Sequence, residues 1–282
     1  MKTYLVPVDF SETSLNAARF AAALSHQTEV KQIILLNAYY VSPYETMLPN
    51  PDMVQLQQEE IEANAADRLH KLELIKHKLS KLAKQSVEIV THVNRTHLVR
   101  GVVENVESRN VDVVMLGAQG NSSKEDTQIG GHVIQLAKAC PVPVIVVPRD
   151  YHFASVKRVV VACDFNKVKD TVPLEGLKRL LSKKDYELMV VNVDHEARHK
   201  NHDSERAAEE SALHGMLRQY HPHYYYLDSP DVISGILKFA EEKDAQIVIA
   251  LPHKYSFFQS LLHNSISQQL AQVAAVPVLL LK

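Results

Sequence analysis

The hydrophobic and polar positions of the chain alternate between short apolar runs and longer amphipathic segments. Apolar runs of about four to eight residues are typical of buried strands, whereas apolar residues spaced three or four apart are typical of helices. Strands that alternate with helices in this way predict a parallel sheet with right-handed crossovers. In the first half of the chain the predicted strands are residues 4–8, 33–40, 86–93 and 111–116, and the predicted helices are 15–25, 61–82 and 98–108.

Two of the predicted helices carry further signals. Ser11 and Thr13 lie just before the first helix, and either hydroxyl suits an N-cap. The long helix has apolar residues at helical spacing, which predicts one stripe that packs against the sheet. That stripe consists of Ile61, Ala65, Leu69, Leu72, Leu79 and Leu82.

The pattern starts again near Val156, and matching residues recur at a fixed offset. The offset is 155 positions near the start of each half and 134 positions near the end. The matching pairs are Asp9 with Asp164, Asn37 with Asn192, Gly101 with Gly235, and Pro143 with Pro277. One deletion of 21 residues, 155 less 134, accounts for the change if it replaces the proline loop and long helix. We interpret the chain as two diverged copies of one α/β unit.

The composition excludes several classes of protein. Hydrophobic residues make up 46% of the 282 residues, which is ample for two domains. Lys and Arg number 31 against 33 Asp and Glu, so the chain lacks the basic surface typical of nucleic-acid binding. No secretory leader is evident, and no apolar run approaches the roughly 20 residues that span a membrane. Cys140 and Cys163 suit free thiols in a reducing cytosol, so we expect a cytoplasmic protein without nucleic-acid or membrane partners.

Glycine is scarce in the chain and concentrated in one turn. Four of the eight glycines, Gly117, Gly120, Gly130 and Gly131, follow the fourth predicted strand. Glycine permits φ > 0 and lets a backbone approach a ligand closely. The turn leads into a predicted helix at 132–139, and the free N–H groups at a helix N-terminus attract phosphate. The turn is therefore a candidate backbone-lined anion site.

Three stretches of the sequence resemble the universal stress protein family in its tandem two-domain form. They read VPVDFSETS, GAQG…IGGHVIQLAKACPVPVIVVP and HNSISQQLAQVAAVPVLLL, and the resemblance covers essentially the whole chain. It implies an α/β fold of two tandem doubly wound domains, Rossmann-like and similar to adenine nucleotide alpha hydrolases, at residues 1–149 and 155–282. Each domain is expected to hold a five-stranded, mainly parallel sheet, with nucleotide at the carboxyl ends of the strands.

The resemblance also implies a set of ligand contacts. ATP-binding members of the family show a glycine, two residues, a glycine, nine residues, and a glycine followed by Ser or Thr. Gly117, Gly120 and Gly130 keep this spacing, but Gly131 stands where the hydroxyl residue belongs, which removes a contact worth about 1 kcal/mol. The implied ligand is ATP or AMP in the first domain, with or without Mg²⁺. The implied contact residues are Pro7, Asp9, Asn37, Leu116, Gly117, Gly120, Gly130, Gly131 and His132.

Some of these residues have two interpretations. Asp9 follows the first strand and either accepts hydrogen bonds from a ribose or adenine, or caps the first helix as an Asx turn. His132 either replaces the missing phosphate contact or is solvated at a helix start. Glu125 and Asp126 disfavour a bare triphosphate nearby unless Mg²⁺ intervenes.

The second half has lost the spaced glycines. Leu251, Lys254 and Asn264 occupy their positions, and side chains there crowd a phosphate. Ser265 does supply the hydroxyl that the first half lacks. We therefore expect no nucleotide in the second domain, and we expect the apolar loop around Phe257 to pack against a partner or the other domain.

We identify no residues for dedicated catalysis, because the sequence shows no Ser-His-Asp order, no paired-acid motif and no Walker lysine. The segment 195–203 holds three histidines and two acids, but its spacing fits a solvated loop better than a zinc site. The ring-rich segment 220–228 is interpreted as part of a strand. The protein is therefore not expected to be an enzyme in the usual sense.

Three functions are left open. The leading hypothesis is a stress-response protein that binds an adenine nucleotide in its first domain, with a structural or regulatory second domain. The alternative is a nucleotide-independent interaction protein, in which the strands at 143–147 and 277–281 pair the two domains within one chain and a homodimer is left open. The third is weak ATP hydrolysis or self-phosphorylation at Ser122, Ser123 or Thr127.

Overall fold

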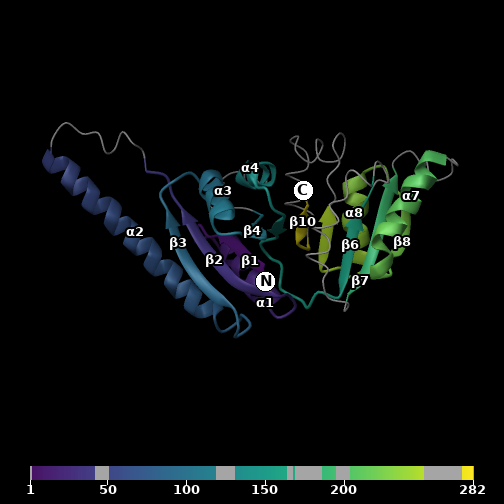
Figure 1. The fold of residues 1–282 in the computed structure, drawn as a ribbon, viewed down its shortest axis with the longest axis horizontal. Coiled ribbons are helices and arrows are strands. Elements are labelled where there is room, and N and C mark those ends of the chain that lie inside the picture. Colours follow the sequence, from purple (N-terminus) through teal and green to yellow (C-terminus); the bar gives the residue numbers. More distant parts are fainter. Residues whose placement is uncertain are drawn as a thin grey trace.

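Two α/β units share a single sheet in the structure, which is a computed structural model (Figure 1). It describes residues 2–41, 51–118, 131–163, 168, 186–194, 204–250 and 275–281. The first half contains β1 (Lys2–Pro7), α1 (Glu12–Leu24), β2 (Val30–Ala38), α2 (Pro51–Leu79), β3 (Glu88–Asn94), α3 (Leu98–Ser108), β4 (Val113–Gly117), α4 (Gly131–Ala139) and β5 (Val144–Val147). The second half contains β6 (Arg158–Ala162), β7 (Glu187–Asp194), α7 (Ser204–Leu217), the short 3₁₀ helix η3 (Arg218–Tyr220), β8 (His223–Asp228), α8 (Val232–Glu242), β9 (Ile247–Ala250) and β10 (Val278–Leu280).

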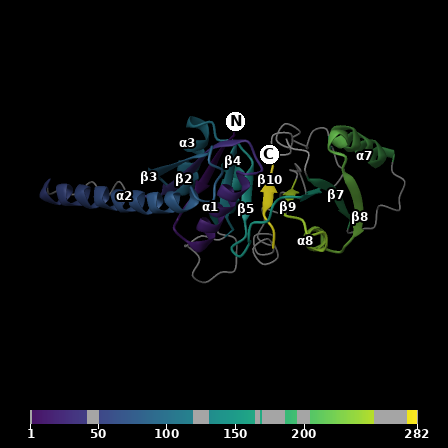
Figure 2. The ribbon, with the colours of Figure 1, turned by 90° about the horizontal axis from the view of Figure 1, so that it is seen from below.

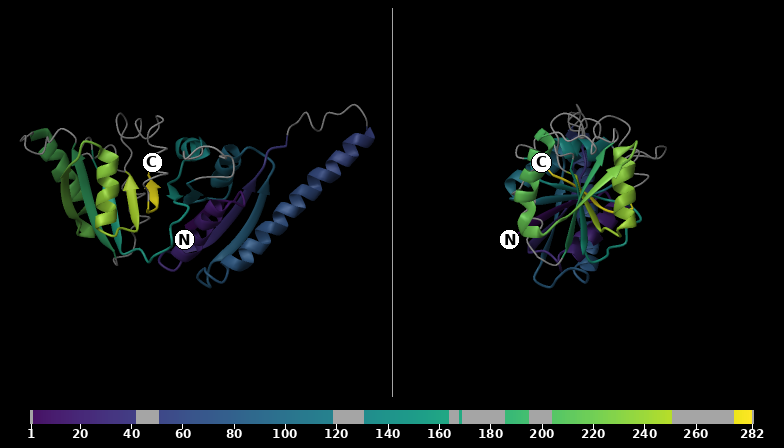
Figure 3. Two further views of the ribbon diagram at one scale, coloured as in Figure 1. Left: turned by 180° about the vertical axis from the view of Figure 1, so that it is seen from behind. Right: turned by 90° about the vertical axis from the view of Figure 1, so that its right-hand side faces the viewer.

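The strand order places β1 between β2 and β4. Across the described residues the ten-stranded sheet has the order β3-β2-β1-β4-β5-β10-β9-β6-β7-β8, so the second half repeats the order of the first in reverse. Within each half the strand pairs are parallel. The predicted α/β fold, two doubly wound domains with mainly parallel sheets, is therefore confirmed. The strand direction rotates steadily along the sheet, as the right-handed twist of strands requires (Figure 3).

Helices cover both faces of the sheet, because its parallel strands are apolar on both sides. In the first half α3 lies on one face, and α1 and α2 lie on the other (Figure 2). Val102 of α3 and Leu136 of α4 belong to one buried cluster with Leu5 of β1. The core on the α1 face continues into the second half, where it includes Leu213 of α7 and Leu279 of β10.

The two halves of the sheet meet at β5 and β10, which are the one antiparallel strand pair described. Val144, Ile145 and Val146 pair with Leu280, Leu279 and Val278 respectively. Ile145 and Leu279 are themselves equivalent at the offset of 134 positions. A local pseudo-two-fold axis therefore passes between these two residues, perpendicular to the sheet.

The strand register corrects the predicted single deletion between the two copies. Leu5 pairs with Ile34 and their equivalents at an offset of 155, Val160 and Met189, also pair. However, the pair of Leu35 and Thr91 corresponds to Val190 and Tyr224, so β8 lies at an offset of 133 from β3. Later elements lie at 134, as β10 against β5 shows. The copies thus differ by a deletion of 22 residues before β8 and an insertion of one residue after it.

The helix starts show which sequence signals were correct. Ser11 is the N-cap of α1, and its Oγ accepts a hydrogen bond of 3.2 Å from the Ser14 amide. Thr13 is not a cap: it lies inside α1 and is 5% exposed. The prediction for Thr13 was wrong because its side chain packs against β4, as described below.

The predicted apolar stripe of α2 is only partly buried. Leu72 and Leu79 are fully enclosed, but Leu69 is 43% exposed and Leu82, which lies beyond the helix end, is 49% exposed. The N-terminal part of α2 extends beyond the edge strand β3 (Figure 1). The prediction was wrong at both leucines. A helix that projects past its sheet cannot bury every residue of its stripe, which accounts for Leu69, whereas Leu82 is exposed beyond the C-terminal end of the helix.

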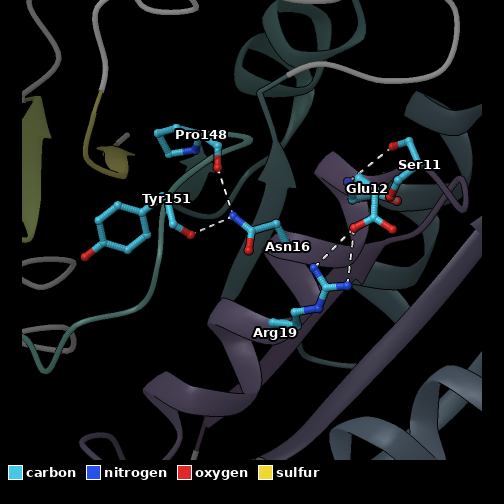
Figure 4. Close-up of polar contacts among 7 residues, drawn as sticks. Ser11, Glu12, Asn16, Arg19, Pro148 and Tyr151 are labelled. Atoms are coloured by element: carbon cyan, nitrogen blue, oxygen red, sulfur yellow. Dashed lines mark hydrogen bonds and ion pairs between the residues drawn. The ribbon is translucent and has the colours of Figure 1, made fainter.

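The segment that joins the two halves is packed against α1. The side-chain amide of Asn16 donates hydrogen bonds of 3.0 Å to the Pro148 carbonyl and 2.9 Å to the Tyr151 carbonyl (Figure 4). Phe20 packs edge-on against the rings of Tyr151 and Phe153, at 5.9 and 5.6 Å between centroids. We call residues 148–157 the linker; these contacts give it a fixed position on the first half.

Further along, the linker is held by two glutamine side chains. Gln27, just after α1, exchanges two hydrogen bonds with the backbone of Val156, at 2.7 and 3.2 Å. Gln246, before β9 of the second half, accepts bonds of 2.8 Å from the amides of Lys157 and Arg158. The linker is thus fixed to the first half at both of its ends and to the second half at its later end.

Candidate functional site

The predicted site residues that the structure describes gather at one edge of the sheet. Parallel strands end on the same side, so the carboxyl ends of β2, β1 and β4 lie next to one another. The chain leaves β1 toward β2 on one side and later returns to β4 on the other. The gap between β1 and β4 is therefore the topological switch point, where doubly wound sheets place their ligands.

Pro7 and Asp9 mark the end of β1. Pro7 is buried and pairs with Leu36, and the Val8 amide continues the ladder with a bond of 2.8 Å to the Leu36 carbonyl. Asp9 is exposed at the edge, and its Oδ1 accepts bonds from the Ser11 amide at 3.0 Å and the Ser11 hydroxyl at 2.5 Å. This is an Asx turn, as one interpretation of Asp9 required, but it orders the residues before the helix, whose N-cap is Ser11 and not Asp9. The other interpretation, contact with a ribose or adenine, stays a prediction.

The turn after Asp9 is sharp. Phe10 has a φ of 67°, a left-handed conformation that costs free energy in a residue with a bulky side chain. The Asp9 amide donates to the Ser14 hydroxyl at 3.3 Å, and the Ser14 hydroxyl donates to the Ser11 carbonyl at 3.0 Å. This hydrogen-bonded turn holds Phe10 in place and directs the chain from β1 straight into α1.

Asn37 has a structural role that sequence reasoning missed. It is 2% exposed, and its Nδ2 donates a bond of 2.6 Å to the Val8 carbonyl. Its Oδ1 accepts a bond of 3.1 Å from Nη1 of Arg68, on α2. The equivalent Asn192 donates to the Cys163 carbonyl at 2.7 Å. The signal for this role was present: an asparagine recurs in an apolar strand, at the same offset as the residue it fastens.

Gly117 also has a packing reason for being glycine. A Cβ built on Gly117 would lie 2.7 Å from the carbonyl carbon, the carbonyl oxygen and the Cγ2 of Thr13. The end of β4 therefore touches the first turn of α1, and any side chain at this position forces the two apart. None of the described glycines has a positive φ, so the expected use of φ > 0 does not hold for Gly117.

The remaining predicted contacts lie on the β4 and α4 side. The Leu116 side chain is buried in the core, so only its backbone faces the edge. Gly131 is the first residue of α4, one residue earlier than predicted, and His132 follows in the same turn. Because α4 connects the parallel strands β4 and β5, it runs against them and starts at their carboxyl side. Gly120 and Gly130 lie outside the described residues, as does the acidic pair Glu125 and Asp126.

In the second half, most of the predicted features lie outside the described residues. These are the positions that replace the spaced glycines, Ser265, Phe257 and the histidine-rich segment 195–203. The ring-rich segment does form β8, as predicted. In the described parts of the chain, no group of three or more His, Cys, Asp or Glu side chains is placed to hold a metal ion. None of the described helices has the length and hydropathy to cross a membrane.

Burial shifts the pKa of two titratable groups near the helix-covered faces of the sheet. Burial raises the pKa of the Tyr224 phenol to about 12, and the nearby Cys163 and Glu210 act in the same direction. Burial also lowers the pKa of His92 in β3, and the positive charge of Arg109 adds to this. Both groups therefore remain neutral at neutral pH, and neither belongs to the strand ends that form the candidate site.

Comparison with known proteins identifies relatives of both halves. The family model described as the universal stress protein family matches residues 1–148 and again 155–282. A universal stress protein from Archaeoglobus fulgidus DSM 4304 is 18% identical, with 99% of this chain and 96% of that chain covered and a TM-score of 0.62. A protein of unknown function from Pseudomonas aeruginosa PAO1 is 13% identical, with 100% and 92% covered and a TM-score of 0.57.

A third structure is less similar. It is a universal stress protein family protein from Arabidopsis thaliana with AMP bound, 13% identical, with 52% of this chain and 90% of that chain covered. Its TM-score of 0.35 is too low to support an argument about the present chain. At identities this low, the first two structures support a conclusion about the fold alone. Among curated protein sequences, no significant match was found.

Proposed function

Because the chain belongs to the universal stress protein family and carries its domain twice, we propose that residues 1–149 bind an adenine nucleotide, ATP or AMP, with or without Mg²⁺. Residues 155–282 then form a structural or regulatory half that binds no nucleotide. In this proposal the protein acts in the stress response of the cytoplasm, without dedicated catalysis.

The main support for this proposal is that three strand ends and the start of one helix lie on the same side of the sheet. The carboxyl ends of β2, β1 and β4 surround the switch point, and α4 begins on the same side of the sheet. Free N–H groups at the start of α4 suit a phosphate, and the exposed Asp9 suits a hydroxyl or amino group at the other end of the ligand. The spacing of Gly117, Gly120 and Gly130 adds the family pattern for ATP, less the hydroxyl at Gly131.

The test is equilibrium binding together with mass spectrometry. Protein purified without added nucleotide is measured under native conditions and again after denaturing release, and is then titrated with ATP, ADP and AMP, with and without Mg²⁺. We expect a co-purifying or titratable adenine nucleotide, and at least about a tenfold loss of affinity in Gly120→Lys. A protein that carries no nucleotide and gains no thermal stability from millimolar ligand contradicts the proposal.

The choice of variants matters, because Gly117 supports the fold. Substitution of Gly117 pushes β4 away from Thr13, so a loss of binding in such a variant would not identify a ligand contact. Gly215 in α7 provides a matched control, since a Cβ there meets nothing within 4 Å. Gly215→Lys adds the same side chain to the second half, and we expect it to leave nucleotide affinity unchanged.

A nucleotide-independent interaction protein is the second candidate. It is favoured by the packing roles of Asn37 and Gly117, which account for both residues without a ligand. In this case the site is inherited architecture, and partners bind to the surface of the domain pair. Unchanged partner binding and stress phenotype in Gly120→Lys support this candidate and argue against the first.

The pairing of the two halves through β5 and β10 in solution is part of both candidates. Since each half uses its last strand within the chain, neither strand is available to a second copy. A monomer by light scattering agrees with this pairing, whereas a stable homodimer requires another surface. Weak ATP hydrolysis or self-phosphorylation is checked in the same preparation by phosphate release and intact mass.

A further inference from the structure

Arg68 brings a positive charge to the candidate site from a distant part of the sequence. It lies in α2, and its Nη1 donates to Oδ1 of Asn37 at 3.1 Å. Its Cζ also lies 4.4 Å from the ring centroid of Tyr39, the residue that follows β2. Both contacts fix the guanidinium at the carboxyl end of β2, beside the end of β1 that Asn37 fastens.

The guanidinium of Arg68 has no counter-charge in the described parts of the chain. Its hydrogen-bond acceptor is a neutral amide oxygen, and the ring of Tyr39 offers only a weak attraction. The neighbouring cation Lys71 is paired with Asp67, at 2.6 Å. An arginine is always charged, and a partly buried charge without a partner costs free energy. The surroundings of Arg68 are therefore complementary to an anion.

Two buried polar atoms of Arg68 and Tyr39 also indicate that an anion binds here. Nε of Arg68 and Oη of Tyr39 are both buried, and in the described residues neither has a hydrogen-bond partner. Buried polar atoms are nearly always satisfied in native proteins, so an unpaired pair of this kind marks a place for a bound group. Nε donates only, and a phenol donates readily, so the complementary group is rich in acceptor oxygens and negatively charged.

The position of Arg68 separates it from the start of α4. β2 and β4 flank β1, so the two sides of the site lie about two strand spacings apart, roughly 10 Å. A phosphate bound by the N–H groups of α4 therefore cannot also be the group that meets Arg68. The two ends of the site suit a ligand with negative charge at both of its ends.

We propose that Arg68 and Tyr39 bind a phosphate group at the β2 end of the site, distinct from the phosphate that α4 would hold. This inference rests on the proposed nucleotide function, and it narrows the ligand class to nucleotides with a second phosphate on the ribose. Free inorganic phosphate has the same chemistry and is the other source of such a group. Arg68 then has two roles. Its Nη1 orients Asn37, and its Nε and positive charge contact the ligand.

The experiment compares ligands that differ by one phosphate. AMP, adenosine 3′,5′-bisphosphate and inorganic phosphate are titrated calorimetrically into the full chain and into Arg68→Met, Arg68→Lys and Tyr39→Phe. We expect the bisphosphate to bind the wild-type chain about tenfold or more tighter than AMP. We expect this ratio to fall to about one in Arg68→Met and to fall partially in Tyr39→Phe.

The controls separate charge, structure and ligand source. Arg100 on α3 is an exposed cation paired with Glu104. Arg100→Met removes the same charge, and we expect it to leave the ratio of bisphosphate affinity to AMP affinity unchanged. Saturable phosphate binding that is lost in Arg68→Met supports the site and identifies free phosphate as its source.

Several results overturn the assignment. A ratio near one in the wild-type chain, or a ratio that persists in Arg68→Met, removes the second phosphate contact while AMP binding stands. Equal loss of both nucleotides in Arg68→Met and Arg68→Lys shows that Arg68 only holds Asn37. If no nucleotide and no phosphate binds at all, the proposed function and this inference both fail.

Discussion

At the residue scale, the candidate site is held together by contacts that do not involve a ligand. Asn37 fastens the end of β1, and Gly117 lets β4 touch the first turn of α1. Asp9 orders the turn between β1 and α1 through the backbone and side chain of Ser11. The edge of the sheet is therefore shaped before any ligand arrives, which lowers the ordering cost of binding.

The close contact at Gly117 predicts a large effect from one methyl group. Gly117→Ala places a Cβ 2.7 Å from the Thr13 backbone, which cannot move aside like a flexible side chain. We expect it to lower the free energy of unfolding by about 1–3 kcal/mol. Gly215→Ala, with open space around its Cβ in α7, should raise stability by up to about 1 kcal/mol. Urea denaturation of both variants checks the pair, and similar effects of the same sign would contradict it.

His92 predicts a pH dependence of stability. Its pKa is lowered below the ordinary 6.5 by burial and by Arg109, so the folded chain resists a proton that the unfolded chain accepts. Stability from His92 is thus fully present above that ordinary value and is lost as pH falls below it and through the lowered pKa of the folded chain. We expect His92→Gln to show a smaller loss of unfolding free energy between pH 7.5 and 5.5 than wild type. The chain has 15 histidines, so the difference between the two proteins carries the result, and equal slopes would rule out a role for His92.

At the element scale, α1 connects the candidate site to the linker. The helix begins with the cap at Ser11, beside Asp9, and its later residues Asn16 and Phe20 hold the linker. Figure 4 shows Ser11 and Asn16 on this helix, with the bonds from Asn16 to Pro148 and Tyr151 and the exposed pair of Arg19 and Glu12. A displacement of α1 at the site would therefore also displace the linker.

The grip of α1 on the linker is measurable by proteolysis. Asn16→Ala removes two hydrogen bonds to the linker backbone, a loss of about 1–3 kcal/mol in local stability. Trypsin should then cut faster at Arg149 and Lys157, which are exposed at either end of the linker. Arg19→Ala, which removes only an exposed ion pair on the same helix, should leave the rate unchanged. Equal cleavage of Asn16→Ala and wild type would show that the linker is held by other contacts.

Elements with strong local signals were predictable from the sequence, and contacts between distant segments were not. The bounds of α3 are the predicted ones, because Val102 and Val106 recur at helical spacing between clear polar breaks. The roles of Asn37 and Gly117 depend on Val8 and Thr13, which only the folded sheet brings near them. The one-residue insertion after β8 was invisible without the strand register, because no residue match marks it.

For the site itself, the sequence indicated the edge of the sheet but not the arrangement on it. Pro7, Asp9, Asn37, Leu116 and Gly117 do lie at the carboxyl ends of neighbouring strands. Arg68 was not foreseen, because α2 carries charged residues on most of its surface and nothing in the spacing distinguishes this one. Its contacts with Asn37 and Tyr39 arise only in the folded chain, where α2 brings it beside the end of β2.

At the scale of the whole molecule, the two halves share a sheet and a core. The buried cluster on the α1 face contains Ile145 and Val159 as well as Leu279, so it does not stop at the linker. A continuous core favours cooperative unfolding of both halves together. The strand pair at the pseudo-two-fold axis is the place where this cooperativity can be broken.

Leu279 is the position for that test. Leu279→Asp buries a charge at a residue 2% exposed, opposite Ile145 in the antiparallel pair. We expect the free energy of unfolding to fall by more than about 3 kcal/mol. The single calorimetric transition of the wild-type chain should become two transitions in the variant, because the halves then unfold separately. Leu82→Asp, at an exposed leucine, should leave the transition single and nearly unshifted. A single transition in Leu279→Asp would place the coupling between the halves elsewhere.

The pairing of Ile145 with Leu279 also has a genetic consequence. In a symmetric dimer of identical chains, each mutation changes both sides of the axis at once. Here the two sides are encoded by different codons, so a substitution at Ile145 leaves Leu279 as it was. Each copy can therefore drift separately while the other keeps the joint intact. Selection can hold the shared sheet constant and still act on the loops of one copy alone.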